Sequence, residues 1–530
     1  MIFSSIAHGD YVFCIGYFVL AALALRHTKV GDKICYSAKM LRVATSLAGL
    51  VILVYLAEII IYGFYPNFGD HSEPTVASIA WLGLHGKAYY PDLDKGNLYG
   101  LVYGPLLYFI NSIFLSISPT LTAVKLAGIV PLLLALGIMF STVRQRTNDF
   151  LVSLFIVASL VSVFEHYGLE VYWNRAEPYL ILIAVLALFA ATRLRPITAA
   201  VVIGSLAGVA AGFKINGFLY VLPMATMLLA GAKRPREFTI LSAIGIGCAA
   251  IFMSAPFWAH PSSVYDYFQY LKLAGHEGLS FELFIKNCIF AIAIFAPVAF
   301  VLYWRRPALG LRERWLIAGL TLSLAITVVI AAKPGSGTHI FIPFIPLCLY
   351  ATAVLLDADS TKASGIAALV FLLTFIAYFP SFAFQIAWSK GLLANAQFER
   401  VKAGEIRELL DAYPDAQIGV SDQEHYIDTH YSKFLSVLKG HSIRVDFTAW
   451  MDLQLGGVQE SNITRLVQRD SNGCNVPTWI LPLGAPFTMV SRYTMRPEVS
   501  DEFRRTFYEN YKLVHMSRAF QVWVCKLSNM

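Results

Sequence analysis

Long apolar runs alternate with short polar segments from the N-terminus to about residue 390. A run of roughly 20 apolar residues suits a helix that crosses a bilayer, because its length then matches the ~30 Å hydrocarbon core. Several of the runs are shorter than this, so their ends are approximate. The pattern predicts about twelve spanning helices, at residues 9–25, 43–64, 120–143, 150–165, 178–192, 197–213, 217–232, 238–258, 284–304, 315–332, 340–356 and 364–384.

Basic residues between these runs predict the orientation of the chain. Most of them fall in alternate loops, which the positive-inside rule assigns to the cytoplasm. The N-terminus, the longer loops and the C-terminal part then lie on the outer face. The basic loops contain Arg26, Lys29, Lys33, Lys39, Arg42, Arg144, Arg146, Arg193, Arg195, Lys233, Arg234, Arg236, Arg305, Arg306, Arg312, Arg314 and Lys362.

One further apolar segment, residues 101–118, is short and is interrupted by Gly104 and Pro105. If it crossed the membrane, every later loop would change sides and the basic loops would face outward. We therefore expect this segment to lie along the outer membrane surface or to re-enter the membrane from that side.

The last part of the chain has a different pattern. Charge rises after residue 396, and short alternating runs typical of strands are interspersed with helix-like stretches at 399–412 and 499–509. This favours a small α/β domain at residues 393–530, following a membrane domain at 1–392 with a large outer loop at 65–119. The predicted strands are Gln417–Ser421, Ile443–Phe447, Trp479–Leu483, Tyr511–Met516 and Phe520–Leu527.

Composition supports a membrane protein and excludes other classes. Of 530 residues, 57% are hydrophobic and only 14% are charged, whereas soluble domains carry roughly 25% charged residues. The net charge of +7 is explained by the loops, and no dense basic run suggests a nucleic-acid partner. No nucleotide-binding glycine motif and no Cys/His metal spacing occurs. Cys474 and Cys525 can form a disulfide if their domain is outside the cytosol, but their spacing alone does not decide it.

The outer loop after the second predicted span contains two carboxylates and an imidazole, Asp70, His71 and Glu73. If Asp70 opens a helix, it can cap that helix while Glu73 lies on the same face. A purely structural role as cap and first-turn charge is the alternative. At a membrane boundary, with a second ionisable cluster on the same side, we favour a functional role. Tyrosines later in the loop, Tyr103 among them, are typical of interfacial anchors.

Cationic residues gather in three other outer segments. Arg175 and Glu177 begin a span, where they form either an internal ion pair or, through Arg175, a contact with an anionic ligand. Lys214 either extends to the membrane surface or meets a ligand that its small neighbours allow to approach. Lys333 and His339 lie in a Gly/Pro-rich segment, which favours a turn. The alternative is a phosphate cradle formed by backbone N–H groups and the lysine.

Carboxylates that accept a proton and cations that hold phosphate together suit the transfer of a group from a phosphate to a hydroxyl. The carboxylate deprotonates the acceptor, and the cations stabilise the departing phosphate. This combination, on one predicted membrane face, is the strongest functional signal in the sequence.

The chain resembles the GT-C class of membrane glycosyltransferases, in the group of protein-mannosyltransferase-like and aminoarabinose-transferase-like enzymes. The features that carry the resemblance are the acidic stretch beyond an early helix, the basic-then-apolar alternation and the C-terminal outer domain. Three loose motifs add to it. They are Asp70-His71-Ser72-Glu73, Tyr103-Gly104-Pro105-Leu106-Leu107-Tyr108 and the segment from Gly335 through His339 to Pro346.

The resemblance implies transfer of a sugar from a polyprenyl-phosphate-linked donor to a lipid, glycan or protein acceptor on the outer face of the membrane. It also implies a bacterial inner membrane location with the C-terminal domain outside the cytoplasm. Metal use stays open: no ligand set stands out, but a divalent cation remains a candidate cofactor. The implied residues are Asp70 and Glu73 for catalysis, Arg175, Lys214 and Lys333 for the donor phosphate, and His71, Tyr103, Glu177 and His339 for the cavity lining.

One departure from the family pattern is the extra helix at residues 9–25, which precedes the helix that leads into the acidic loop. Two other functions fit parts of the pattern. A transporter or flippase of a lipid-linked saccharide also has many spans with a few membrane charges, but here the charges gather at one face. A non-catalytic assembly protein would explain the C-terminal domain but not the ionisable clusters of the helical part.

Overall fold

The computed structural model describes residues 2–26, 38–93, 97–258, 264–276, 278–305, 309–357, 363–470, 473–491 and 497–526. The described residues form two compact units. The first comprises those within Met1–Gly63, Gly128–Ala255 and Leu279–Gly391, and the second those within Phe64–Ala127, Pro256–Gly278 and Leu392–Met530. The predicted division near residue 392 into a membrane domain and an extracytoplasmic domain stays a prediction.

Among the described residues, ten helical segments are long and apolar enough to cross a membrane. This confirms the predicted class of a polytopic, mainly helical membrane protein with a small α/β region at its C-terminus. The segments are α3 (Ala38–Phe64), α6 (Leu121–Thr147), α7 (Phe150–Tyr167) with η2 (Gly168–Val171), α8 (Ala176–Arg193), α9 (Pro196–Phe213), α11 (Pro235–Ser254) with η4 (Ala255–Phe257), α13 (Phe281–Arg305), α14 (Leu311–Ile330), η5 (Thr338–Phe344) with α15 (Ile345–Asp357), and α16 (Ala363–Ala412).

Two of the twelve predicted spans are not among these ten. Residues 9–25 belong to α1 (Ile2–Arg26), whose described apolar stretch, Tyr11–Ala24, is short. Residues 217–232 form the short η3 (Gly217–Tyr220) and then α10 (Leu222–Leu229), which has only eight residues and contains a proline. Eight residues at 1.5 Å each reach about 12 Å, well under the thickness of a bilayer.

The interrupted segment at 101–118 forms α5 (Pro105–Ile117), with Gly104 before its first turn and a proline at its start. Its 13 residues correspond to about 20 Å, too short for a straight span. Its placement along the membrane surface stays a prediction. Of the residues used to predict orientation, Lys29, Lys33, Arg306 and Lys362 lie outside the described ranges.

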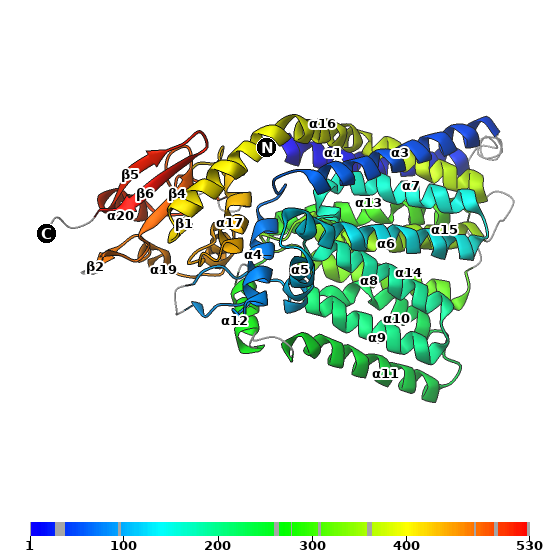
Figure 1. The fold of residues 1–530 in the computed structure, drawn as a ribbon. Helices are drawn as coiled ribbons and strands as arrows, with labels where there is room; N and C mark the ends of the chain where they lie inside the picture. Colours follow the sequence, from blue (N-terminus) through cyan, green and yellow to red (C-terminus); the bar gives the residue numbers. More distant parts are fainter. Residues whose placement is uncertain are drawn as a thin grey trace. The chain divides into compact units, whose positions relative to one another are not determined.

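In the first unit, called the helical unit below, α9 and α11 lie side by side (Figure 1) at a separation that only small residues allow. A Cβ added to Gly204 would come within 2.3 Å of the Gly245 carbonyl oxygen, and one added to Gly208 within 2.3 Å of the Ala249 carbonyl oxygen. Such close backbone approach stabilises helix pairs in lipid, where packing replaces the hydrophobic drive. The η5–α15 span is almost wholly enclosed, whereas α11 is almost wholly unburied, as expected of a helix that faces lipid.

The C-terminal part contains a four-stranded sheet (Figure 1) in the order β1-β4-β6-β5. β1 pairs with β4 in parallel, and the other neighbours are antiparallel. Four of the five predicted strand segments therefore form the sheet. The strands are β1 (Ala416–Ile418), β4 (Thr478–Pro482), β5 (Tyr511–Met516) and β6 (Phe520–Cys525).

The fifth strand prediction, Ile443–Phe447, is wrong. Val445 makes a single bridge with Leu98 of the outer loop and joins no sheet. The segment is too short to extend the pairing, because the Asp446 carboxylate accepts the backbone N–H groups of Thr448 and Ala449 and so begins α18 (Phe447–Leu455). An aspartate that caps a helix is favoured over strand continuation at this point.

The sheet packs against the last turns of α16. Ile406 and Leu410 of that helix contact Ile480 and Phe520 of the sheet in one buried cluster. The remaining elements of this unit surround the sheet or the outer loop. They are α4 (Ser72–Leu84), α12 (Val264–Gly275), α17 (Asp428–Leu438), α19 (Ser461–Thr464), β2 (Arg469–Asp470), β3 (Gly473–Cys474) and α20 (Asp501–Asn510).

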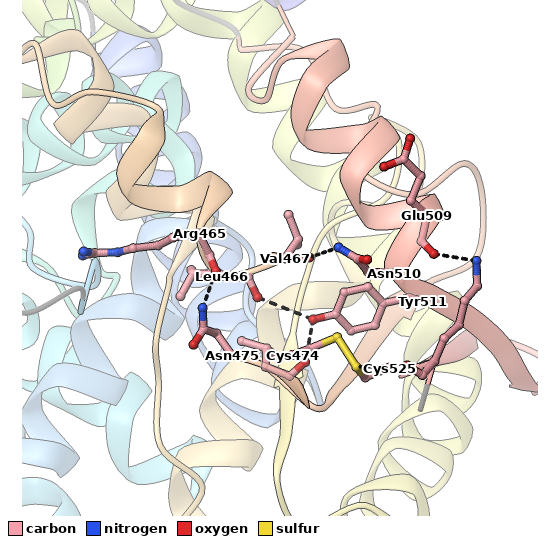
Figure 2. The surroundings of a disulfide bond; sticks show 11 residues. Arg465, Leu466, Val467, Cys474, Asn475, Glu509, Asn510, Tyr511 and Cys525 are labelled. Carbon is pink, nitrogen blue, oxygen red and sulfur yellow. Dashed lines mark hydrogen bonds between the residues drawn. A yellow bond between two sulfur atoms is a disulfide. The ribbon is translucent and has the colours of Figure 1, made fainter. Parts of the chain in front are cut away.

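A disulfide joins Cys474 to Cys525, at the end of β6 (Figure 2). Next to it, the Tyr511 hydroxyl donates to the Val476 carbonyl oxygen at 2.6 Å, and the Asn510 amide donates to the Val467 carbonyl oxygen at 3.0 Å. These bonds fasten the β2–β3 hairpin region to the edge of the sheet. Disulfides are typical of oxidising compartments outside the cytosol, which agrees with the predicted orientation.

Candidate functional site

The acidic turn before α4 uses its two carboxylates differently. The Glu73 side chain is fully buried and turns back to accept the backbone N–H groups of Gly69, at 3.0 Å, and Asp70, at 3.1 Å. The ammonium of Lys125, also buried, lies near enough for its charge to act on Glu73. Bonds of this kind to an ionised carboxylate are strong, so Glu73 fixes the shape of the turn.

Asp70 is the more accessible of the two, with one fifth of its side chain exposed. Its Oδ1 accepts the Ser72 backbone N–H at 2.8 Å, and its Oδ2 lies 3.0 Å from His71 Nδ1. The helix begins at Ser72, one residue later than an Asp70 cap would require. Asp70 is thus oriented by two neighbours while it keeps access to solvent, as a proton acceptor requires.

A buried lysine–aspartate pair, which the sequence analysis did not find, holds α4 in place. The ammonium of Lys433, on α17, donates to Asp446 Oδ1 at 3.1 Å and to Thr75 Oγ1, on α4, at 3.2 Å. The Thr75 hydroxyl in turn donates to Asp446 Oδ2 at 2.8 Å. All three side chains are buried, and an ion pair in such a place is stable only when every polar atom is paired.

The same network reaches the backbone of the acidic turn. The Thr448 hydroxyl lies 3.2 Å from the His71 carbonyl oxygen, and it also lies 2.9 Å from the Tyr426 hydroxyl. Burial raises the pKa of Tyr426, so this residue stays a neutral hydrogen-bonding group. Helices from the C-terminal part therefore hold the loop that presents Asp70.

The tyrosines of the outer loop are buried, and this overturns their interpretation as interfacial anchors. The Tyr90 hydroxyl donates to the Tyr103 carbonyl oxygen at 2.5 Å, and the Tyr108 hydroxyl donates to the Leu101 carbonyl oxygen at 3.1 Å. A Cβ at Gly100 would come within 2.6 Å of the Tyr270 ring. These tyrosines fix the path of the loop. Tyr103 itself is half-buried, and a role for its side chain in lining a cavity stays a prediction.

The helical unit contains the second cluster, centred on Glu177 in the first turn of α8. The Glu177 carboxylate is buried, and it accepts the Lys214 ammonium at 2.5 Å through Oε1 and the Trp173 indole N–H at 3.0 Å through Oε2. Arg175 Nε lies 3.8 Å from Oε2, and His339 Nε2 lies 3.7 Å from Oε1. The structure thus brings together four of the predicted residues from three separate segments.

Local packing presents Arg175 to this cluster. Its guanidinium lies over the Trp173 ring, with its central carbon 3.9 Å from the ring centroid. Gly128 of α6 allows the backbone before Arg175 to approach, because an added Cβ would lie 1.9 Å from the Trp173 carbonyl oxygen. A planar guanidinium stacked in this way has restricted rotamers and holds its N–H donors in a fixed geometry.

Lys214 follows the end of α9 and points to Glu177 rather than to the surface, with only 14% of its side chain exposed. Of the two alternatives for Lys214, extension to the membrane surface is therefore wrong, and its contact with the donor phosphate stays a prediction. Burial lowers the pKa of its ammonium, and the Glu177 carboxylate opposes this effect. Lys333 is half-buried, six residues before His339 on the same connecting segment, and its assignment to the donor phosphate stays a prediction.

Several charged groups meet in this cluster. Two permanent cations, Arg175 and Lys214, and the titratable His339 lie around the carboxylate of Glu177, and the charge of Glu170 also acts on Lys214. Arg175 is buried and Lys214 has only 14% of its side chain exposed, so these cations are stable here only with anionic groups beside them. The arrangement is chemically suited to bind an anion with several acceptor oxygens.

No group of three or more His, Cys, Asp or Glu side chains in the described part of the chain is arranged to hold a metal ion. The divalent cation left open by the sequence therefore has no assigned ligands.

Comparison with known proteins informs on the fold of this chain. No family model matches the sequence, and no curated protein matches it.

Two solved structures are similar to this chain over most of its length. One is described as ArnT from Cupriavidus metallidurans bound to undecaprenyl phosphate, with a TM-score of 0.56 and 12% sequence identity over 91% of this chain and 99% of that one. The other is the same protein in the apo state, with a TM-score of 0.52 and 11% identity over 91% and 98% of the two chains. This chain therefore has the GT-C-like fold of that aminoarabinose transferase, which confirms at the level of the fold the resemblance seen in the sequence.

Proposed function

We propose that this chain is a membrane glycosyltransferase that takes a sugar from a polyprenyl-phosphate-linked donor. The observation that carries the proposal is the convergence of Arg175, Lys214 and His339 on Glu177, because guanidinium and ammonium groups suit the phosphate of such a donor. The similar fold of ArnT bound to undecaprenyl phosphate supports the same ligand class. The acceptor is a lipid, a glycan or a protein, on the outer face of the membrane.

The proposed reaction is a single displacement at the anomeric carbon of the sugar. Asp70 accepts the proton of the acceptor hydroxyl while the hydroxyl oxygen forms a bond to that carbon. The bond from the carbon to the phosphate oxygen breaks, and its electron pair leaves with the polyprenyl phosphate. Arg175 and Lys214 stabilise the negative charge on the departing phosphate. No protein acid is needed, since phosphate is a good leaving group.

The environments of the two carboxylates favour Asp70 as the base and Glu73 as a positioning residue. Glu73 already accepts two backbone N–H groups and is enclosed, whereas Asp70 keeps one fifth of its side chain exposed. His71 lies beside Asp70 and orients its second oxygen. A general base contributes roughly 10²- to 10⁴-fold to the rate, which sets the expected loss on its removal.

Transfer by purified protein in detergent tests the proposal. A synthetic polyprenyl-phosphate sugar is incubated with a mixture of lipid and glycan acceptors, and new glycosides are detected by mass spectrometry. We expect transfer by the wild type, a loss of at least about 100-fold in Asp70→Asn, and little change in Asp92→Asn, which alters an exposed aspartate of the same loop. Full activity of Asp70→Asn would remove Asp70 from the mechanism.

Transport of a lipid-linked saccharide is the second candidate, favoured by two buried carboxylates in the helical unit. Glu58 of α3 and Glu165 of α7 are near each other and almost fully buried. Glu58 is six residues from the end of its helix, about 9 Å along the axis, and Glu165 is two residues from the end of its own. Both lie near a helix end and not at mid-helix, where transporters bind their cargo. Transfer in detergent, with no second compartment, excludes transport as the whole function.

A further inference from the structure

A polar pocket lies among the helix ends of the helical unit, away from the cluster around Glu177. It has a volume of about 200 Å³ and is lined by residues of α6, α8, α10, α14 and α15. Three arginines from three of these helices, Arg146, Arg193 and Arg312, line it together with Glu313 and Tyr350. In the sequence, these arginines predict only the orientation of the chain.

The pocket is separate from the proposed sugar-transfer site. Glu177 lies in the first turn of α8 and Arg193 in its last turn. Arg193 follows Glu177 by 16 positions, which correspond to about 24 Å along the helix axis. The two sites are therefore at opposite ends of one spanning helix.

Arginines outnumber carboxylates among the described residues that line the pocket. The Arg146 Nη2 lies 3.5 Å from Oε1 of Glu313, which is the only carboxylate among those described residues. The Arg312 Nη2 donates at 2.8 Å to the Ala191 carbonyl oxygen, in the last turn of α8, which turns its guanidinium toward that helix. Three guanidinium groups, which stay charged at every physiological pH, thus surround one carboxylate.

The membrane topology does not by itself require the three arginines to line one pocket. The positive-inside rule asks only that arginines occur in these loops, and Arg195 and Arg314 satisfy it without lining the pocket. Charges of one sign that gather around a small polar pocket repel each other and are stabilised by a bound anion. Guanidinium groups from several directions offer paired N–H donors, the geometry that phosphate oxygens accept.

We propose that this pocket binds a phosphate group, carried by the headgroup of an anionic lipid or free in solution. Its volume suits one phosphate with a few water molecules of ~30 Å³ each. Arg193 and Arg312 hold the phosphate, and Arg146 bridges it to Glu313. The proposal does not depend on the sugar-transfer function, because none of these residues belongs to that site.

Binding to the full-length purified protein tests the proposal and distinguishes the two sources of phosphate. In one arm, inorganic phosphate is titrated in detergent at constant ionic strength, with chloride as the reference anion. In the other, the protein is placed in nanodiscs of phosphatidylcholine alone or of phosphatidylcholine with phosphatidic acid, and retained lipids are counted by native mass spectrometry. Arg193→Ala and Arg312→Ala are compared with Arg195→Ala and Arg314→Ala.

We expect phosphate or phosphatidic acid to bind the wild type, and the affinity to fall about tenfold or more in Arg193→Ala and Arg312→Ala only. Arg193→Lys, which keeps the charge but loses the paired donors, should weaken binding by less, and it serves if the alanine variant does not fold. Binding by phosphatidic acid alone assigns the site to a lipid headgroup, and binding by inorganic phosphate assigns it to the free anion. Equal losses in the pocket and control variants, or no binding of either probe, would overturn the proposal.

Discussion

The two ionisable clusters each contain a buried glutamate, and their partners differ. Glu73 accepts hydrogen bonds from two backbone N–H groups of its own turn and lies near the Lys125 ammonium, so we assign it the role of shaping the loop. Glu177 is contacted by the side chains of Arg175, Lys214 and His339, which are groups of the kind that bind the oxygens of an anionic ligand. A buried carboxylate is therefore informative about function through the groups that satisfy it, and not through its burial.

The largest expected effect on stability is that of Glu177→Gln. Loss of the Glu177 carboxylate leaves Arg175 and Lys214 in a poorly solvated position without this anion. Such a change costs roughly 3–5 kcal/mol in buried pairs. We expect a clear fall in the unfolding temperature of the detergent-solubilised protein, and partial recovery on addition of polyprenyl phosphate. Glu282→Gln, at an exposed glutamate of α13, is the matched control. Equal unfolding temperatures for the two variants would contradict the role of Glu177.

The next largest expected effect on stability is at the buried pair of Lys433 and Asp446, which holds the acidic turn. Lys433→Met leaves the buried Asp446 without its cation, although Thr75 and two backbone N–H groups still donate to it, and we expect a loss of about 3 kcal/mol. The double variant Lys433→Met/Asp446→Asn should be more stable than the sum of the single changes predicts, because it removes both charges. Additive losses, measured by chemical unfolding, would show that the two residues do not interact.

A smaller effect separates the two carboxylates of the acidic turn. Glu73→Gln replaces an ionised acceptor of two backbone N–H groups by a neutral one, and we expect a loss of about 2 kcal/mol. Asp70→Asn should leave stability nearly unchanged while it removes the proton acceptor. Unfolding curves and kcat, measured on both variants, test this contrast. If Asp70→Asn destabilised the protein more than Glu73→Gln, the assignment of roles would be reversed.

Much of the fold was predictable because hydrophobic runs report directly on helices in a membrane. The strands Tyr511–Met516 and Thr478–Pro482 were recognisable from β-branched and aromatic residues. The segment Ile443–Phe447 has the same local pattern but no partner strand, and a single sequence does not reveal which runs find a partner. Likewise, the eight-residue α10 was hidden inside a continuous apolar run.

The site was predictable as a list of residues and not as an arrangement. Arg175, Glu177, Lys214 and His339 were each singled out, but their convergence depends on contacts between segments far apart in sequence. Lys433 and Asp446 were missed because their bonds to Thr75 join positions more than 350 residues apart. The one local signal was Asp446 ahead of a helical stretch, which is typical of a helix cap.

The binding of undecaprenyl phosphate to purified variants tests the central claim most directly. Lys214→Gln removes one cation of the Glu177 cluster, and Lys87→Gln removes an exposed lysine of the outer loop. The role proposed for Lys214 predicts about tenfold weaker binding for Lys214→Gln, from the loss of one charge-assisted hydrogen bond, and unchanged binding for Lys87→Gln. Equal affinities for the wild type and both variants would contradict the claim that this cluster holds the donor phosphate.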